Sequence, residues 1–261
     1  MKETRKILDE LVSGKISPEE AEKKIKTLTL QKVEELAMID VDRETRSGIP
    51  EIVFAESKDP EDIITIVQKM LDSQDAVLVT RLQQEKLDYL FKKLNGVNIQ
   101  VYGKNPILTA LISTPNWCAE EDKGRIAIIT AGTSDIPYAK EAEALARMMG
   151  VEVLCYFDIG VSGIHRLFDP IKEIVAKDVD AIIVFAGMEG ALPTVVAALI
   201  DIPVIGVPVP TGYGFGGKGE TALASMLQSC SPGLAVVNIG NGLGAASVAS
   251  LIAIRAARHR R

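Results

Sequence analysis

Apolar and polar positions change their spacing twice along the chain and so divide it into three segments. In the first 30 residues, Ile7, Leu8, Leu11 and Val12 fall on one face of a helix. The following Ser17-Pro18-Glu19-Glu20 has a capping-box Ser and Glu, with Pro at the first helical position, and predicts a second helix. We therefore expect the N-terminus to form a short helical hairpin.

Between about residues 42 and 117 the pattern becomes one of short β-rich runs. The runs EIVFA, AVLVT and NIQVY alternate with the amphipathic stretches PEDIITIVQKMLDS and QEKLDYLFKKL, which favours a small α/β unit. The apolar pattern then lapses into the charged segment AEEDKG. We expect a boundary there, between a unit of residues 1–120 and a unit of residues 121–261.

Beyond this boundary, continuous apolar runs alternate with helical patterns. The runs are RIAIITAG, VEVLCYFD, AIIVFAG, PVIGVPV and LAVVNIG. Apolar strands separated by helices predict a parallel sheet with helices on both faces, a three-layer α/β fold. In such a sheet, ligands bind outside the carboxyl ends of the strands, where the strand order reverses. The functional residues are therefore expected in the loops that leave the strands.

These exit loops carry glycines, hydroxyls and carboxylates. The first, residues 131–135 (AGTSD), can present amides and hydroxyls to a phosphate or carboxylate, although Ser134 or Asp135 equally fits a plain helix N-cap. The third, residues 187–193, holds Glu189 among glycines that allow close approach of a ligand. The fourth, PVPTGYGFGGKG, is either a mobile lid or a surface loop.

A lone thiol marks the last of these regions, QSCSPGLAVVNIGNGLGAA. Cys230 precedes a short strand that ends in Asn238, Asn241 and a run of glycines. Such a thiol can attack an electrophile held against the glycine backbone, and the alternative is a small buried residue. Proton transfer falls to carboxylates, His165 or Cys230, because the other histidine, His259, lies in the basic tail.

Composition and missing motifs narrow the class of protein. The chain has 261 residues, 47% of them hydrophobic and 25% charged, as expected of a globular protein, and its net charge of −6 argues against a general nucleic-acid binder. Three cysteines without metal spacing, a charged N-terminus and short apolar runs predict a cytoplasmic protein without a membrane span. Gly132 and Gly187, each closing a strand, do not make the spaced GxGxxG fingerprint, which argues against hydride-transfer enzymes. GxxxxGK[ST], HExxH and a GxSxG elbow are missing, which argues against P-loop proteins, zincins and α/β-hydrolases.

Several ordered motifs resemble those of a known family. AGTSDIPYAKEA, GVSGIHRL, FAGMEGALPTVVA, PVIGVPVPTGYG and VVNIGNGLGAA look like successive motifs of LarB, the carboxylase/hydrolase that builds the nickel-pincer nucleotide cofactor. DRETRSGIPEIVFAESK resembles the N-terminal motif of that family. The C-terminal half also resembles the PurE carboxylases and mutases of purine biosynthesis. The resemblance implies a PurE-like, flavodoxin-like or Rossmann-like parallel sheet with a smaller N-terminal α/β unit and, by analogy, a homo-octamer.

One position separates the two relatives. Where the purine enzymes have a histidine directly before Leu-Pro, this chain has Ala191, so an aminoimidazole ribonucleotide carboxylase/mutase would lack its main proton-transfer group. The chain departs from the LarB pattern at Gly240, where aspartate is common, at Leu243, where phenylalanine is common, and at Ser57, where glycine is usual. These departures keep a non-catalytic nucleotide-binding protein as a further alternative.

The LarB resemblance also implies a reaction. Nicotinic acid adenine dinucleotide would be carboxylated at pyridinium C5 with CO₂ or bicarbonate through an adduct on Cys230, and its phosphoanhydride hydrolysed to release AMP. Glu189 or Asp135 would take the ring proton. Mg²⁺ is expected to assist hydrolysis although the sequence shows no cluster of metal ligands, and no tightly bound organic cofactor is expected. The implied substrate-binding residues are Gly132, Thr133, Ser134, Arg43, Arg46, Lys58, His165, Gly187, Met188, Gly212, Tyr213, Asn238 and Asn241.

Overall fold

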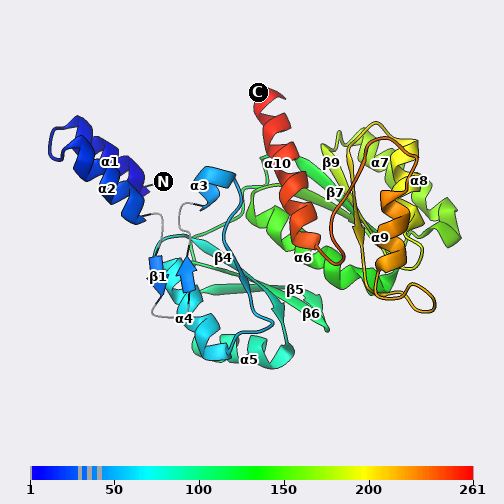
Figure 1. Cartoon of the computed structure of the whole chain (residues 1–261), viewed down its shortest axis with the longest axis horizontal. Coiled ribbons are helices and arrows are strands. Elements are labelled where there is room, and N and C mark those ends of the chain that lie inside the picture. The colour runs from blue at the N-terminus through cyan, green and yellow to red at the C-terminus, as the bar shows by residue number, and fades with distance from the viewer. Residues whose placement is uncertain (1, 29–30, 34–36, 40–42, 261) are drawn as a thin grey trace.

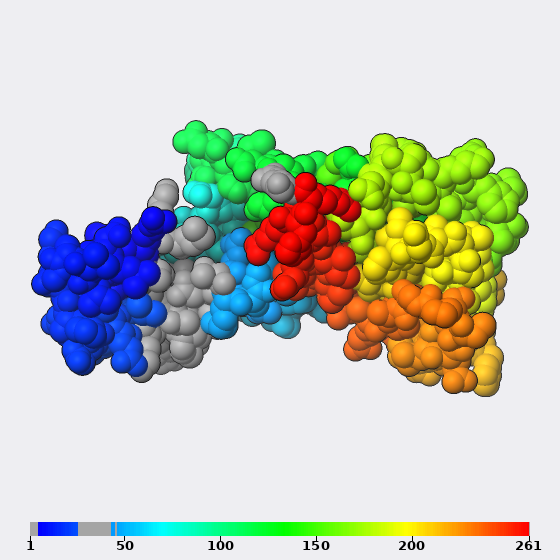
Figure 2. Space-filling model, turned by 90° about the horizontal axis from the view of Figure 1, so that it is seen from above, coloured from blue at the N-terminus to red at the C-terminus, as the bar shows by residue number. Residues whose placement is uncertain are grey.

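The computed structural model describes residues 2–28, 31–33, 37–39 and 43–260. A helical hairpin of α1 (Lys2–Val12) and α2 (Pro18–Leu28) lies at one end of the molecule, as predicted (Figures 1 and 2). The predicted capping box is formed, because the Ser17 N–H donates to Glu20 Oε2 at 3.0 Å and the Glu20 N–H donates to Ser17 Oγ at 3.1 Å. These two bonds satisfy amides that a helix start leaves free, and so they define where α2 begins.

A four-stranded sheet follows, in the order β3-β4-β6-β5, with β3 and β4 parallel and the other neighbours antiparallel. Its strands are β3 (Ile52–Phe54), β4 (Ala76–Leu82), β5 (Asn98–Lys104) and β6 (Ile107–Ser113), and the elements around it are β1 (Gln31–Val33), β2 (Ala37–Ile39), α3 (Arg43–Ser47), α4 (Pro60–Leu71) and α5 (Gln84–Lys93). The sequence pattern missed β6. Every residue of that strand is buried, and its Thr109 and Ser113 break the apolar run without giving an apolar-polar alternation.

The second sheet is five-stranded and all parallel, in the order β11-β10-β9-β7-β8. Its strands are β7 (Arg125–Thr130), β8 (Glu152–Tyr156), β9 (Ala181–Ala186), β10 (Val204–Pro208) and β11 (Leu234–Val236). Every residue of β9 and β10 is buried, as expected for strands covered on both faces. The predicted α/β fold, a parallel sheet with a smaller N-terminal sheet, is confirmed.

Helices cover both faces of the parallel sheet (Figure 1). On one face lie α6 (Ile136–Met148), preceded by the 3₁₀ turn η1 (Thr133–Asp135), and α10 (Gly242–Arg260); on the other lie η2 (Val161–Leu167), α7 (Phe168–Ala176), α8 (Ala191–Leu199) and α9 (Glu220–Leu227). The small residues of α10 pack against α6, so this helix covers the sheet of its own chain. Within the described residues, no helix has the length and apolar composition needed to cross a bilayer.

One apolar core runs from the first sheet to the second through α6. This helix contacts β5 and β6 on one side and β7 and β8 on the other. Leu78 of β4, Leu145 of α6 and Ile128 of β7 belong to the same cluster of buried side chains. The predicted boundary near residue 120 lies in the connection between β6 and β7. The two sheets are therefore held together by burial of apolar surface as well as by the chain.

Because this core is shared, Leu78→Ala should destabilise both sheets together. Leu78 is fully buried, and such a substitution costs about 2–5 kcal/mol. We expect a single calorimetric transition at a lower Tm. As a control, Val12→Ala removes a side chain that is 88% exposed on α1 and should change the free energy of unfolding by less than about 0.5 kcal/mol. A new early transition with the main one unmoved would show that the first sheet unfolds independently.

Candidate functional site

A cavity lies where the order of the parallel strands reverses. After β7 the chain places β8 on one side of it and then crosses to place β9 on the other. The loops that follow β7, β8, β9 and β10 enclose a cavity of about 460 Å³. Parallel sheets bind their ligands at this kind of switch point, so the cavity is the candidate site.

Asp135 joins two of these loops at the floor of the cavity. Its buried carboxylate accepts the Gly132 N–H at 2.8 Å and the Thr211 hydroxyl at 2.8 Å. Burial raises the pKa of Asp135 above its usual value, while both hydrogen bonds oppose the shift and the nearby Asp158 adds to it. The Gly132 amide, predicted to face a phosphate, is thus engaged by Asp135. Thr211, which no sequence pattern marked, holds the loop after β10 against Asp135 through its hydroxyl.

Glycines let the cavity loops approach one another closely. A Cβ at Gly160 would lie 2.7 Å from the Ala131 carbonyl oxygen, and one at Gly187 would lie 2.4 Å from Thr211 Oγ1. Close to these glycines in the chain, Asp158 and Met188 adopt left-handed backbone with φ of 59° and 50°. This conformation is uncommon for residues with side chains and is concentrated at functional sites. The loops after β8 and β9 therefore have a backbone that packing holds in place.

Glu189 presents the exposed carboxylate of the cavity. It lies in the loop after β9 with Gly187 and Met188, and all three line the cavity as predicted for this loop. Among the described residues, Glu189 has no hydrogen-bond or ion-pair partner, so its carboxylate is available to a ligand. Ala191 lines the same wall.

The glycine loop (residues 209–219) forms one side of the cavity through Thr211 and Tyr213. Tyr213 is 81% exposed, and a Cβ at Gly212 would lie 3.4 Å from the Met188 nitrogen. The loop after β10 thus lies against the loop after β9, with the Tyr213 phenol at the rim. Ser134 also lines the cavity, and Thr133 is exposed beside it.

Cys230 lies at the other end of the parallel strands from the cavity. Because α9 leads back from β10 to the start of β11, its C-terminal connection lies beside the amino ends of the strands, where the Val204 N–H donates to the Gly233 carbonyl at 3.0 Å. Cys230 is exposed in this connection and does not line the cavity, so it is not a small buried residue. Within one chain, the structure does not bring this thiol to Asp135 or Glu189.

The two asparagines of the final motif have local roles. Asn238 Oδ1 accepts the Ile239 N–H at 2.8 Å, and Asn241 Oδ1 accepts the Gly244 N–H at 2.8 Å, which caps the start of α10. His165 is exposed in η2, and Val161, at the start of this turn, lines the cavity. None of these three predicted residues lines the cavity.

The predicted basic residues also lie away from the cavity. Arg43 pairs with Glu51 at 3.1 Å and shares α3 with the exposed Arg46. That helix lies near the middle of α10, because a Cβ at the neighbouring Gly48 would be 2.9 Å from Leu251 Cδ2. Lys58 lies in the turn after β3, where its carbonyl accepts a hydrogen bond from Lys86 Nζ at 2.8 Å.

The described residues do not form a resident Mg²⁺ site. No group of three or more His, Cys, Asp or Glu side chains among them is placed to hold a metal ion. Both carboxylate oxygens of Asp135 are taken by protein donors, and Asp158 pairs with Arg166 at 2.9 Å. Mg²⁺ therefore stays a prediction without assigned ligands.

Family comparisons divide the chain in two. A model described as LarB/PurE-like N-terminal domain matches residues 30–108, and a model described as AIR carboxylase matches residues 125–260. The first covers the smaller sheet as far as the start of β6, and the second covers the parallel sheet with its cavity.

Individual relatives span either nearly the whole chain or about half of it. An uncharacterized protein of Methanocaldococcus jannaschii is 44% identical over 253 residues, 97% of each chain. The N5-carboxyaminoimidazole ribonucleotide mutase of that organism is 36% identical over 116 residues, 44% of this chain and 68% of the mutase. A crystal structure of a PurE2 variant from Treponema denticola aligns with a TM-score of 0.42 and 22% identity, over 52% of this chain and 87% of that chain. With a LarB/PurE-like N-terminal domain ahead of an AIR carboxylase domain, this chain belongs to the LarB family, as its motifs predict.

Proposed function

We propose that this protein carboxylates nicotinic acid adenine dinucleotide at pyridinium C5 and hydrolyses its phosphoanhydride, giving pyridinium-3,5-biscarboxylic acid mononucleotide and AMP. The family models and the mutase relative support a carboxylase/mutase-type enzyme. The observation that carries the narrower proposal is the wall of the cavity after β9, where an available Glu189 lies beside Ala191. Alanine cannot transfer a proton, so this wall suits a reaction whose base is Glu189 better than the purine mutase reaction.

Carboxylation at C5 needs a nucleophile from the protein, because an electron-poor pyridinium carbon does not attack CO₂. A thiolate that adds to the ring carbon beside the nitrogen turns the ring into an enamine, whose C5 then attacks CO₂. Loss of the C5 proton to a base and expulsion of the thiolate restore the aromatic ring. The net reaction consumes CO₂ and releases one proton.

Cys230 is the thiol best suited to this step. Burial raises the pKa of Cys155 to about 12, which leaves it protonated at neutral pH. Cys230 and Cys118 are exposed, and Cys230 lies in the segment that resembles the LarB motif. A bound pyridinium cation would favour the thiolate form of an approaching cysteine.

We infer that this chemistry uses a second copy of the chain. Cys230 and the cavity lie at opposite edges of one sheet, so the thiol of one subunit would enter the cavity of its neighbour. An exposed cysteine in a surface connection can do so in a symmetric homo-oligomer, which a PurE-like octamer would be by analogy.

Glu189 and Asp135 suit different roles. Glu189 is exposed in the cavity and free to take the C5 proton. Asp135 is buried with both oxygens bonded, so it suits the work of holding the loops after β7 and β10 together. Hydrolysis adds water across the phosphoanhydride, and the Ser134 hydroxyl of η1, which lines the cavity, would bind a phosphate there. We assign no step to Mg²⁺.

The central test is mass spectrometry of the protein incubated with the dinucleotide, bicarbonate and Mg²⁺. We expect the dicarboxylated mononucleotide and AMP, and a loss of carboxylation of at least about 100-fold in Cys230→Ala with the fold retained. Cys118→Ala removes the other exposed thiol and serves as the matched control, with unchanged turnover. Full carboxylation by Cys230→Ala, or turnover of N5-carboxyaminoimidazole ribonucleotide instead, would sink the proposal.

Co-assembly of two inactive variants tests the shared site. Chains that carry Cys230→Ala still have Glu189, and chains that carry Glu189→Gln still have Cys230. If each site takes its thiol from a neighbour, random mixing in equal amounts rebuilds about one quarter of the sites. We expect about that fraction of wild-type carboxylation after joint refolding, against nearly none for either variant alone. Activity no higher than that of the parents would place both groups in one chain.

The roles of the two carboxylates separate in Asp135→Asn and Glu189→Gln. Loss of a general base lowers kcat by roughly 10²–10⁴-fold, which we expect only for Glu189→Gln, and we expect less than about tenfold for Asp135→Asn.

The raised pKa of Asp135 also predicts how stability depends on pH. Because the pKa is higher in the folded state, the ionised Asp135 carboxylate lowers the free energy of unfolding at neutral pH, and this penalty disappears as the pH falls through the folded-state pKa toward the ordinary value of 3.8. The Tm of Asp135→Asn relative to wild type should thus be highest near pH 8 and decline in acid. A relative Tm that rises in acid would contradict this assignment.

A further inference from the structure

Arg81 has an unusual backbone for a residue with a long side chain. It lies in β4 within the irregular pairing with β6 between Val79 and Leu82, and its φ is 57°. Irregular pairing of this kind redirects a side chain, and left-handed backbone persists only where surrounding contacts hold it. The side chain of Arg81 makes these contacts.

The guanidinium of Arg81 binds a fully buried carboxylate on α6. Arg81 Nε donates to Glu141 Oε1 at 2.9 Å and Nη2 donates to Glu141 Oε2 at 3.2 Å, while the Thr80 hydroxyl donates to Glu141 Oε1. The Arg81 guanidinium also lies 5.7 Å from the centroid of the Tyr138 ring. A buried carboxylate needs such partners, and the two parallel N–H bonds set the plane of the guanidinium.

With its plane fixed by Glu141, the Arg81 guanidinium also reaches the loop between β11 and α10 (residues 237–241). Nη2 donates to the Gly240 carbonyl at 2.7 Å, across 159 positions of sequence. The Gly240 N–H donates to the Pro208 carbonyl at 2.8 Å, at the end of β10. The β11–α10 loop is thus held between the smaller sheet on one side and β10 on the other.

The same loop adjoins the cavity through the segment that follows β10. A Cβ at Gly219 would lie 2.8 Å from Ile239 of the loop. Pro208, which accepts the Gly240 amide, is three residues before Thr211, and Thr211 donates to Asp135 on the cavity floor. A shift of Gly240 would therefore move the wall that Thr211 anchors.

We propose that Arg81 is a positioning residue that acts through Gly240 to fix the loops at the carboxyl edge of the parallel sheet. It makes the smaller sheet part of the catalytic unit. Arg81 lies in the segment that matches the LarB/PurE-like N-terminal domain and outside the AIR carboxylase match. The kinetic part of this inference rests on the proposed function, whereas the structural part does not.

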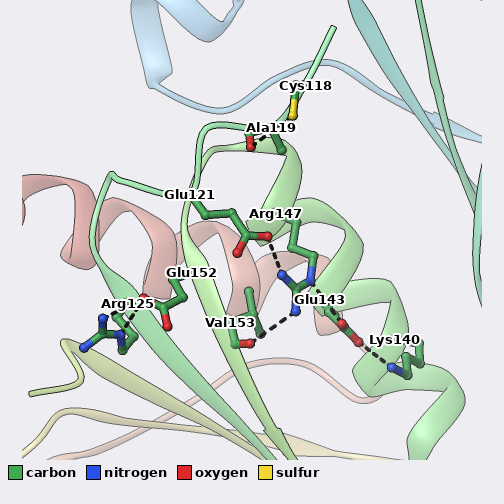
Figure 3. A network of polar contacts seen from close by, with 9 residues as sticks. All are labelled: Cys118, Ala119, Glu121, Arg125, Lys140, Glu143, Arg147, Glu152 and Val153. Carbon is green, nitrogen blue, oxygen red and sulfur yellow. Dashed lines mark hydrogen bonds and ion pairs between the residues drawn. The ribbon is translucent and has the colours of Figure 1, made fainter. Parts of the chain in front are cut away.

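A purely structural ion pair is the alternative, and Arg147 provides a matched control for it. Arg147 binds Glu143 of α6 at 3.1 Å, Glu121, and the Val153 carbonyl at 3.2 Å (Figure 3). The side chains of Arg81 and Arg147 are each 26% exposed, and each arginine pairs with a glutamate of α6 and one backbone carbonyl. They differ in that Arg147 belongs to α6 itself and binds Val153 inside β8, whereas Arg81 comes from β4 and binds Gly240 in the β11–α10 loop.

The first arm of the test is hydrogen exchange on the ligand-free protein. Arg81→Met keeps an apolar stem and removes the hydrogen bonds, and Arg147→Met does the same at the control site. We expect both to lower the Tm, but only Arg81→Met to speed exchange in residues 237–244, by at least about tenfold. Arg81→Lys keeps a cation without the two-pronged geometry and should give an intermediate rate; it carries the test if Arg81→Met does not fold.

The second arm is the kinetics of carboxylation. We expect Arg81→Met to lower kcat by about 10- to 100-fold with KM within about threefold of wild type, Arg81→Lys to recover part of this loss, and Arg147→Met to stay within about threefold. Equal exchange and equal kcat for Arg81→Met and Arg147→Met would overturn the inference. If the wild-type protein does not carboxylate the dinucleotide, the proposed function fails, and accelerated exchange in Arg81→Met alone would still support the positioning contact.

Discussion

The rest of the structure depends on the burial of three carboxylates, which lie just before and within helix α6. Asp135, Glu141 and Glu143 belong to η1 and α6, and a buried charge is tolerated only where it is paired and hydrogen-bonded. Their partners come from different parts of the molecule: Thr211 from the loop after β10, Arg81 from the smaller sheet, and Arg147 from α6 itself. The apolar core joins the two sheets, and Glu141 adds a polar contact between α6 and the smaller sheet through Arg81.

This arrangement explains why the cavity has a rigid floor and a more open rim. Asp135 binds the loops after β7 and β10, and Gly160 and Gly187 let their neighbours approach within contact distance. Glu189 and Tyr213 lie at the exposed side, where a substrate would enter. The proposed nucleophile, Cys230, is exposed beside the amino ends of the strands, and this separation from the cavity is why the proposed reaction calls for the thiol of a second subunit.

The fold was largely predictable because its signals are local. Continuous apolar runs separated by helical patterns indicated the parallel sheet, and the Ser17 capping box indicated the start of α2. Strand β6 escaped prediction, because its buried Thr109 and Ser113 break the apolar run without giving an apolar-polar alternation. The exit-loop rule put Asp135 and Glu189 at one end of the strands, where they line the cavity, whereas residues taken from motif resemblance alone, such as Arg43 and Lys58, lie outside the cavity of a single chain.

By itself the sequence determined the alternation of elements, the position of the crevice and the family, because hydrophobic spacing and ordered motifs lie within short windows of the chain. Only the tertiary structure decided which side chains meet. The pairing of Arg81 with Glu141 and Gly240 joins residues 60 and 159 positions apart and depends on a left-handed backbone that no residue pattern marks. The separation of Cys230 from Glu189 follows from strand direction, since a segment before a parallel strand and a loop after one lie at opposite edges of the sheet.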